Sequence, residues 1–340
     1  MKDSICFDDV LLEPQYSEIQ SRTEIDISSF LNGVGECKSP IISAPMDTIT
    51  ESEMAMSMFV TGGFGIIHRY NSIPEQCSMV RDACFNKQQN LVGVAVGVNG
   101  EFVERAKECI NAGAKIICID VAHGHHSNVR YALKVLRNTL GSSVHIMAGN
   151  VATLAAFNDL ADWGADSIRV GIGGGSICST RTQTGHGVPT LQSIINCSRS
   201  DRDATLVADG GIKTSGDVVK ALAAGADFVM LGSMLAGTSE TPGAIFNDPK
   251  RGHTKIYRGM ASKEAQKDWR GKVSSIEGIT HTVPYKGSVE NVLQDIKTGI
   301  KSGLSYSGAN TIPELQSKAI FIKQSTQSTF ESSTHIISRF

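Results

Sequence analysis

The sequence predicts a (β/α)₈ barrel, a closed ring of eight parallel strands covered by helices. From about residue 91 onward, short β-branched strands alternate with amphipathic helices, a pattern typical of parallel strands packed beneath helices. A Gly-Ala turn leads from helix to strand at 112–114, 163–166 and 224–227. A glycine at the end of a helix, directly before a strand, is the short connection that a parallel sheet uses.

The individual strands follow from this alternation and from two apolar segments upstream. The upstream segments 40–48 and 65–69 can supply the first two strands. Residues 101–111 are expected to form the first helix of the alternating region. The strands expected in that region are 91–98, 115–120, 143–147, 167–170, 205–208 and 228–231.

Glycine and polar residues gather directly after the expected strands, in the segments 120–124, 148–150, 171–181, 209–211 and 232–233. In a barrel the carboxyl ends of all strands form one face, and phosphate binds in the loops after the last strands. A doubly wound open sheet would have to bring all these loops to one switch point. No GxGxxG motif stands between a strand and a helix. The sequence therefore favours the barrel.

The composition is that of an ordinary soluble protein. Of the 340 residues 41% are apolar, and the formal net charge of −2 gives no electrostatic footprint for nucleic acid or an anionic membrane. No apolar run approaches the roughly 20 residues of a membrane span, and the first residues lack a secretory signal. The eight cysteines show no CxxC spacing, which argues against a zinc ribbon or a disulfide framework. We expect a cytoplasmic protein with reduced thiols.

Two segments depart from the alternating pattern. Residues 251–285 are polar and rich in lysine, without clean periodicity, and so long a loop in a compact domain is usually a functional lid or flap. Residues 326–340 form a tail rich in serine and threonine, which we expect to be poorly ordered. The prediction is thus one barrel domain over 1–325, with no second domain.

The segment 171–181 carries the strongest chemical signal, because it places Cys178 at the end of a glycine-rich loop. Glycines let the backbone turn with positive φ and bring its N–H groups close to an anion. A cysteine there can be exposed and near positive potential, which favours the thiolate. The alternative is a glycine-rich hairpin with a buried thiol, since free cysteine is usually a small core residue.

Nine short blocks spread over residues 5–322 carry a further signal: 7–12, 42–48, 120–124, 148–151, 171–181, 208–212, 230–233, 257–260 and 283–287. Each block is a weak signal, whereas the set in this order and spacing is highly specific. Together they resemble the family of inosine monophosphate dehydrogenases and guanosine monophosphate reductases. The resemblance implies a (β/α)₈ barrel, a purine nucleotide held by its phosphate, a nicotinamide cofactor, and Cys178 attacking C2 of the purine.

The resemblance favours the reductase branch of the family. The dehydrogenase activates water with an Arg-Tyr pair in its flap, and no such pair stands between Met260 and Glu277. Glu277-Gly278 matches the reductase, whose glutamate helps to handle the leaving ammonia, and there is no room for the dehydrogenase's usual regulatory modules. Two departures are Ser274, where the reductase usually carries arginine, and Arg69, where lysine is common.

Three functions remain open at this stage. The favoured one is an NADPH-dependent GMP reductase that converts GMP to IMP and ammonia through a covalent thioimidate on Cys178. The resemblance gives Thr180 and Glu277 the task of carrying a proton to the leaving ammonia, although Thr180 could equally be a loop hydroxyl bonded to its own backbone. The alternatives are an IMP dehydrogenase without regulatory modules and a non-catalytic sensor of purine nucleotides.

The resemblance also implies the binding residues and a homotetramer, in which segment 302–306 reaches a neighbour's cofactor. The tract His123-Gly124-His125-His126 suggests a metal site, but no carboxylate pattern follows it and we do not expect one. A monovalent cation such as potassium would lie at Gly173, Gly175, Cys178 and Arg181. The substrate residues would be Ser43, Met46, Ser176, Asp209, Gly210, Gly211, Gly232, Ser233, Gly259, Met260 and Gly278. The cofactor residues would be Ser21, Arg22, Arg69, Asp120, Val121, Ala122, Ile172, Gly173, Ser302 and Ser305.

Overall fold

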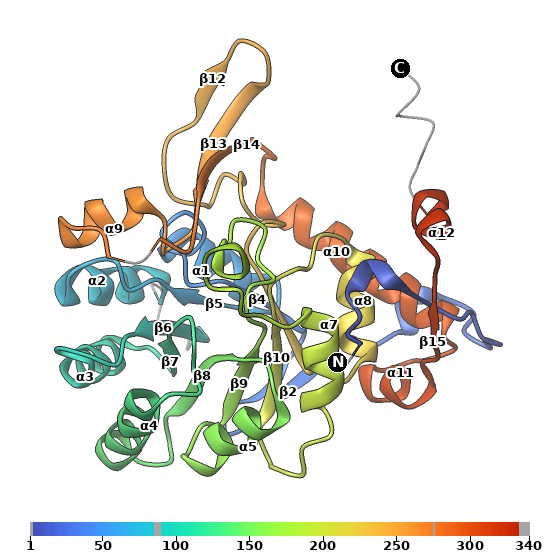
Figure 1. Ribbon diagram of the computed structural model, residues 1–340, viewed down its shortest axis with the longest axis horizontal. Helices are drawn as coiled ribbons and strands as arrows, with labels where there is room; N and C mark the ends of the chain where they lie inside the picture. Colours follow the sequence, from blue (N-terminus) through green and yellow to red (C-terminus); the bar gives the residue numbers. More distant parts are fainter. Residues whose placement is uncertain (1–2, 85–89, 275, 333–340) are drawn as a thin grey trace.

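The predicted barrel is confirmed. The computed structural model describes residues 3–84, 90–274 and 276–332, and eight strands close into a parallel barrel in the order β10-β11-β4-β5-β6-β7-β8-β9. Helices surround this ring (Figure 1). Every expected strand coincides with an observed one: β4 Ile41–Ser43, β5 Phe64–Ile67, β6 Val92–Val96, β7 Ile116–Asp120, β8 His145–Val151, β9 Ser167–Val170, β10 Thr205–Asp209 and β11 Phe228–Leu231.

Helices follow the strands as the alternation requires. The long helix α10 comes after β11 only once the chain has passed through the flap, and the short α6 (Thr180–Thr184) begins within the cysteine loop. The covering helices are α1 Ser52–Val60, α2 Ile73–Ala83, α3 Phe102–Ala112, α4 Ser127–Leu140, α5 Leu154–Asp162, α7 Thr190–Cys197, α8 Ser215–Ala223 and α10 Val289–Tyr306.

Side chains alternate between two apolar layers along each strand. One set fills the inside of the barrel and includes Ile42, Phe64 and Phe228, whose two phenyl rings meet edge to face at 5.8 Å. The other set packs against the helices. The amino-terminal end of the barrel is closed by the hairpin of β2 (Ser29–Leu31) and β3 (Gly35–Cys37), because Leu31 belongs to the inner set.

The Gly-Ala turns take the predicted conformation. Gly113 directly follows α3, and Gly164 and Gly225 lie in the turns after α5 and α8. Their φ angles are 121°, 107° and 108°. Residues with a Cβ rarely adopt these values, so glycine is what lets the chain pass from helix to strand within three or four residues.

Segment 251–285 is not the irregular loop that its composition suggested. It contributes β13 (Gly252–Arg258), α9 (Lys263–Arg270) and β14 (Thr280–Pro284), and β13 pairs with both β14 and β12 (Phe246–Asp248). This sheet projects from the barrel at the top of Figure 1. The strand pattern was hidden because one inward residue is a lysine: Lys255 is buried, and its ammonium donates to the carbonyls of Thr238, Ser239 and Thr241.

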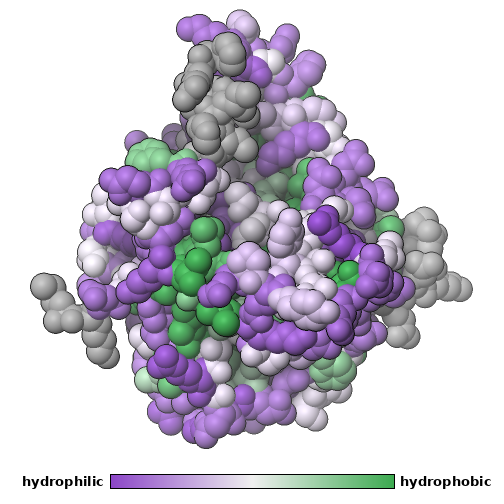
Figure 2. All heavy atoms as spheres, turned by 90° about the vertical axis from the view of Figure 1, so that its right-hand side faces the viewer, coloured by the Kyte–Doolittle hydropathy of each residue, from purple (hydrophilic) through white to green (hydrophobic). Residues whose placement is uncertain are grey.

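The remaining elements lie on the side of the barrel near α8. They are η1 Phe7–Asp9, β1 Val10–Leu12, η2 Arg22–Glu24, α11 Ile312–Lys318, β15 Phe321–Lys323 and α12 Thr326–Glu331, and β1 pairs with β15. Figure 2 shows this side as mostly hydrophilic with a hydrophobic patch, and Ile320, Ile322 and Phe330 are among the exposed apolar residues of this region. Among the described residues no helix is long and apolar enough to cross a membrane.

The expectation of a poorly ordered tail is wrong for its first part, because residues 326–331 form α12. Ser325 begins this helix by accepting a hydrogen bond from the Ser328 amide, a local cap that a serine-rich segment readily supplies. The part of the tail at 333–340 lies outside the described residues.

Replacing Gly225 with alanine should lower the free energy of unfolding by about 2–3 kcal/mol. A Cβ at this positive φ would lie 2.4 Å from the Ser198 Cβ. Gly141 is the matched control, because its φ is also positive (73°) and a Cβ there meets nothing within 4 Å. Urea unfolding of Gly225→Ala and Gly141→Ala measures both, and equal losses would show that packing at the Gly225 turn is unimportant.

Candidate active site

A pocket of about 400 Å³ opens at the carboxyl ends of the barrel strands. Loops after most of the strands contribute to its wall, and the flap covers part of it through residues such as Tyr257, Met260 and Glu277. This is the face on which a barrel of this kind carries its functional residues. The glycine-rich loop 171–178 and the segment 209–212 form one side of the pocket.

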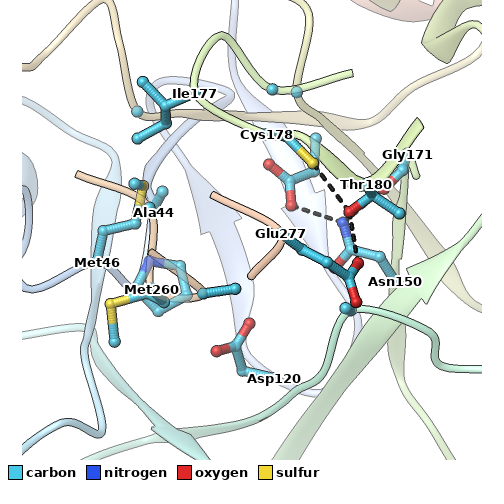
Figure 3. A pocket seen from close by; sticks show the side chains of 18 of the residues that line it. Ala44, Met46, Asp120, Asn150, Gly171, Ile177, Cys178, Thr180, Met260 and Glu277 are labelled. Atoms are coloured by element: carbon cyan, nitrogen blue, oxygen red, sulfur yellow. Dashed lines mark hydrogen bonds between the residues drawn. The ribbon is translucent and has the colours of Figure 1, made fainter. Parts of the chain in front are cut away.

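Cys178, Thr180 and Glu277 form a connected chain of hydrogen bonds in this pocket (Figure 3). The Cys178 thiol donates to Thr180 Oγ1 at 3.2 Å, and Thr180 Oγ1 donates to Glu277 Oε2 at 2.7 Å. Cys178 is exposed, so the interpretation of a buried structural thiol is wrong. The arrangement can move a proton from the sulfur to a carboxylate and back, which is what general acid–base catalysis requires.

Backbone hydrogen bonds hold the flap against the cysteine loop. Cys178 and Gly278 form an antiparallel bridge, the Ser179 amide donates to the Glu277 carbonyl at 2.9 Å, and the Ile279 amide donates to the Ile177 carbonyl at 3.1 Å. Gly278 was expected to contact substrate, but it lies outside the pocket lining and acts here through its backbone. The carboxylate of Glu277 therefore reaches Thr180 because the two backbones are paired.

The glycine loops approach each other closely enough to exclude side chains. Gly210 has φ 89°, and a Cβ there would lie 3.1 Å from the Gly175 amide nitrogen. On the flap side, the Tyr257 hydroxyl lies 3.4 Å from Ser176 Oγ and within 3.1 Å of where a Gly232 Cβ would be. Backbone amides and two hydroxyls thus converge on one end of the pocket, a combination suited to a phosphate.

A buried ion-pair network forms the floor of the pocket. Arg169 is 6% exposed, and it donates to Asp120 Oδ1 at 2.8 Å and to Asp209 Oδ2 at 2.8 Å. Asn150 Nδ2 also donates to Asp209 Oδ2, at 2.8 Å, and Arg69 adds a contact of 3.5 Å from its Nε to Asp120 Oδ2.

The network favours the charged forms of Asp120 and Arg169. Burial alone would raise the pKa of Asp120, but the positive charges of Arg169 and Arg69 and the hydrogen bond from Arg169 outweigh it and lower that pKa below its ordinary value. Burial likewise disfavours the charged guanidinium of Arg169, and the carboxylates of Asp209 and Asp120 raise its pKa well above the ordinary value. Two carboxylates are therefore fixed on opposite sides of one arginine.

Most of the sequence-predicted site residues come together in this pocket. Of the proposed substrate residues, Met46, Ser176, Asp209, Gly210, Gly211, Gly232, Ser233, Gly259 and Met260 line it. Of the proposed cofactor residues, Arg69, Asp120, Val121, Ala122, Ile172 and Gly173 line it.

The prediction that Ser43 contacts substrate needs correction, because Ser43 does not line the pocket. It is completely buried, and its hydroxyl accepts a hydrogen bond from Thr50 Oγ1 at 2.9 Å. The reason is the alternation of side chains along β4: Ile42 points into the barrel, so Ser43 points outward to the helices. Ala44 and Met46, which follow it, line the pocket instead.

Four expected cofactor residues lie away from the pocket. Ser21 and Arg22 belong to the N-terminal region around η2, and Ser302 and Ser305 belong to the last turns of α10. Helix α10 contacts η2, so the four gather in one region of the surface. This chain does not bring that region to its own pocket.

The residues predicted to hold a monovalent cation lie in and directly after the cysteine loop. The Arg181 guanidinium crosses the turn, donating to the Val188 carbonyl at 2.8 Å and to the Ile172 carbonyl at 3.5 Å. The Gly175 carbonyl accepts from the Cys178 amide at 3.1 Å and keeps a second lone pair. The potassium site stays a prediction, and we assign no step to potassium.

The histidine tract has structural partners. His125 Nε2 lies 2.7 Å from Asp159 Oδ2, and His126 Nδ1 accepts from the Asn128 amide at the start of α4. Within the described residues no three or more His, Cys, Asp or Glu side chains gather as they would around a metal ion.

Several residues that line the pocket were not predicted from the sequence. Arg169 is one of them, although a charged residue inside the apolar strand 167–170 was an available signal. Tyr257 stood in one of the matching blocks without a role. Asn150, Tyr70 and Arg270 also line the pocket, and only the folded chain brings them there.

Comparison with known proteins agrees with this geometry. Residues 4–335 match the family model described as "IMP dehydrogenase / GMP reductase domain". The chain belongs to this family. It is 33% identical to the inosine-5′-monophosphate dehydrogenase of Nitrosopumilus maritimus over 98% of both chains, and 31% identical to the GMP reductase of Leishmania major over 100% of this chain and 98% of the relative.

A solved structure supports the barrel as well. The crystal structure of a cysteine-to-alanine variant of GMP reductase from Trypanosoma brucei, in complex with guanosine 5′-monophosphate, superimposes with a TM-score of 0.93 at 29% identity, over 98% of each chain. The family members are oxidoreductases, and relatives of both activities match this chain. The alignments to the two named relatives span 473 and 484 positions, whereas this chain has 340 residues. Both the dehydrogenase and the reductase are therefore longer than this chain, so its lack of inserted modules does not separate the two activities.

Cys178 should be the first cysteine to react with iodoacetamide. It is exposed, whereas burial raises the pKa of Cys37 and Cys118 to about 11 and that of Cys197 to about 12. Peptide mass spectrometry after brief labelling gives the order of reaction. Cys178→Ser is the control and should lose the fast phase. Earlier labelling of Cys6 or Cys84, which are half-buried, would contradict the prediction.

Proposed function

We propose that this protein is a GMP reductase, which uses NADPH to convert GMP to IMP and ammonia. The observation that carries the proposal is the chain from Cys178 through Thr180 to Glu277, because a carboxylate reached through one hydroxyl can both accept the thiol proton and return it. Reductive deamination needs both transfers, since ammonia leaves only after its nitrogen is protonated.

The reaction then follows in balanced steps. Glu277 takes the thiol proton through Thr180, and the thiolate adds to C2 of the purine. The proton passes to the 2-amino group, ammonia leaves, and a thioimidate joins C2 to Cys178. A reduced dinucleotide held in the pocket would supply the hydride that C2 gains. The carbon–sulfur bond breaks, the thiolate leaves with its electron pair, and IMP forms. Covalent catalysis thus divides one difficult displacement into two easier steps.

The nucleotide lies along the glycine loops in this proposal. Backbone amides of Gly210 and Gly211, with the hydroxyls of Ser176 and Tyr257, hold the phosphate. Asp209 binds the ribose through Oδ1, because all three internal donors reach its Oδ2. The thioethers of Met46 and Met260, which lie on the same side of the pocket (Figure 3), flank the purine.

The dinucleotide fits the other end of the pocket. Asp120, Val121, Ala122, Ile172 and Gly173 line that end together with Arg69, whose Nε is buried without a hydrogen bond in the described structure. An unsatisfied buried donor is costly and fits an anionic or carbonyl ligand. Ser21, Arg22, Ser302 and Ser305 would act from a second copy of the chain, in the homotetramer that the resemblance implies.

A second candidate is IMP dehydrogenase, and one observation favours it. Sequence analysis found no adjacent Arg-Tyr pair in the flap, but Arg270 of α9 lies over the Tyr70 ring, 5.9 Å from its centroid, and both line the pocket. The same two residue types activate water in the dehydrogenase. Nothing comparable favours the non-catalytic sensor, because the proton-transfer chain is complete.

The decisive experiment is an absorbance assay of the purified chain in both directions. With GMP and NADPH, we expect loss of the reduced dinucleotide together with formation of IMP and ammonia. With IMP and NAD, we expect little formation of the reduced dinucleotide. Oxidation of IMP without any reduction of GMP would replace the proposed function with the second candidate.

Replacing Glu277 with glutamine should slow IMP formation by roughly 100-fold or more, because it removes the titrating group but keeps its size. GMP binding should stay within about twofold, since Glu277 contacts Thr180 rather than the phosphate end. Stopped-flow mixing with GMP locates the deficit in ammonia release. The control is Glu264→Gln, an exposed glutamate of α9 that lies outside the pocket lining. Unchanged turnover of Glu277→Gln would exclude its role in proton transfer.

A further inference from the structure

Two arginines meet at one aromatic ring in the mouth of the pocket. The guanidinium carbon of Arg69 lies 5.5 Å from the Tyr70 ring centroid, and that of Arg270 lies 5.9 Å from it. The Trp269 ring stacks on the same tyrosine at 5.9 Å with an interplanar angle of 15°. Residues 69 and 70 follow β5, whereas 269 and 270 end α9 of the flap, so the cluster joins two parts of the chain about 200 positions apart.

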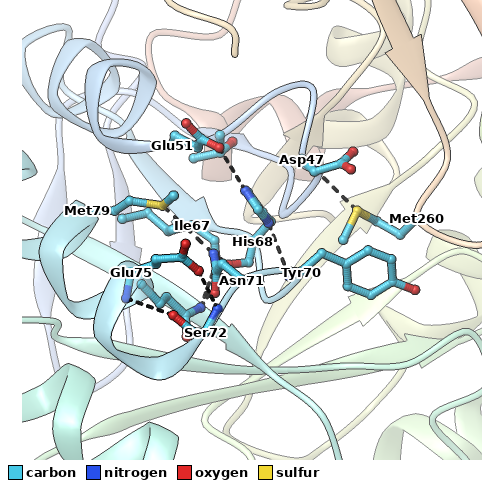
Figure 4. A network of polar contacts seen from close by, with 12 residues as sticks. Asp47, Glu51, Ile67, His68, Tyr70, Asn71, Ser72, Glu75, Met79 and Met260 are labelled. Carbon is cyan, nitrogen blue, oxygen red and sulfur yellow. Dashed lines mark hydrogen bonds and ion pairs between the residues drawn. The ribbon is translucent and has the colours of Figure 1, made fainter. Parts of the chain in front are cut away.

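Hydrogen bonds at His68 and Asn71, the neighbours of Arg69 and Tyr70, hold this turn in place (Figure 4). His68 is buried, its Nδ1 accepts from the Tyr70 amide at 3.2 Å, and its Nε2 lies 3.1 Å from Glu51 Oε1. Because Nδ1 is an acceptor, Nε2 carries the hydrogen and donates it to the carboxylate. Asn71 Nδ2 donates to the His68 carbonyl at 2.9 Å, which closes the turn.

The positive charges of this cluster are only partly compensated. Arg69 Nη2 donates to the Asp120 backbone carbonyl at 3.2 Å. Its Nε lies 3.5 Å from the Asp120 carboxylate without the geometry of a hydrogen bond, and that carboxylate is already bound by Arg169. Arg270 pairs with no carboxylate within the described residues. Asp268, two positions before Arg270 in α9, pairs with Arg258 at 2.6 Å instead. Two guanidinium groups therefore face the pocket with spare donors.

We propose that Arg270 and Arg69 together bind a phosphate of the nicotinamide dinucleotide, with Tyr70 as the ring that holds both guanidinium groups in position. Arginine suits this task because its planar fork can donate two hydrogen bonds to one phosphate, and stacking on an aromatic ring fixes the orientation of the fork. The inference rests on the proposed function for the presence of a dinucleotide. It adds a residue of the flap helix, Arg270, to the cofactor site.

The dinucleotide offers two sources of phosphate, the central diphosphate and the 2′-phosphate that only the phosphorylated form carries. Equilibrium binding of NADP⁺ and NAD⁺ separates them, because only NADP⁺ has the 2′-phosphate. Titration calorimetry of the full chain with each dinucleotide gives both dissociation constants without any turnover of purine.

The variant for this test is Arg270→Gln. We expect its affinity for NADP⁺ to fall at least about tenfold, the loss of a charge-assisted hydrogen bond, with the Michaelis constant for GMP unchanged. Arg270→Lys keeps the positive charge but lacks the planar fork, so its affinity for NADP⁺ should lie between those of the wild type and Arg270→Gln. Lys267→Gln is the matched control, because it removes a positive charge from the same helix at a position outside the pocket lining. It should bind both dinucleotides like the wild type.

Each outcome has one meaning. Equal losses for NADP⁺ and NAD⁺ assign the contact to the diphosphate, and a loss for NADP⁺ alone assigns it to the 2′-phosphate. Unchanged binding in Arg270→Gln overturns the inference, and so does a fall in kcat with unchanged dinucleotide affinity, which would place Arg270 at the reacting carbon. If the wild type fails to reduce GMP while Arg270→Gln still weakens dinucleotide binding, the proposed function fails and the phosphate contact stands.

Discussion

The pocket depends on one buried cation, the guanidinium of Arg169. It bridges the ends of β7 and β10 by binding Asp120 and Asp209, and both carboxylates lie on the floor of the pocket. Burying a charge costs several kcal/mol unless it is paired and hydrogen-bonded, so the two aspartates are required for the arginine as much as the arginine is for them. The same pairing fixes both carboxylates around one guanidinium on the floor of the pocket. Removal of either carboxylate would leave a buried charge only half compensated.

The flap is the second constraint, because it carries Glu277, the carboxylate at the end of the hydrogen-bonded chain from Cys178. Arg258 at the end of β13 donates to Asp47 Oδ2 at 2.7 Å, which ties the flap to the loop after β4. The paired backbones of Cys178 and Gly278 tie it to the cysteine loop. The proposed nucleophile, Cys178, comes from the barrel and its proposed proton acceptor, Glu277, comes from the flap, so their hydrogen-bonded chain exists only while these parts are joined.

Relatives with two different activities match this chain over nearly all of its length, so likeness alone does not separate the two. Under the proposed function, Cys178 and the phosphate end would serve any reaction that starts with attack on C2 of a purine nucleotide. The partner of the second step, water or hydride, would then differ, and we propose that a few side chains of the flap decide it. Relatives with either activity are 31–33% identical to this chain over nearly all of its length, which is enough to keep the barrel and too coarse to fix those side chains.

The sequence by itself determined the parts that depend on local patterns. All eight strands and the helix-end glycines followed from periodicity and from the restricted φ of residues with a Cβ, and the exposed cysteine followed from its glycine-rich loop. Tertiary structure alone decided the rest. The strand β13 was hidden because its buried lysine is satisfied by carbonyls of a different segment, and Ser43 faces outward because the barrel fixes which side of β4 is inside. The meeting of Tyr70 with Arg270 joins residues 200 positions apart, and no local pattern encodes a contact that forms only when the flap packs on the barrel.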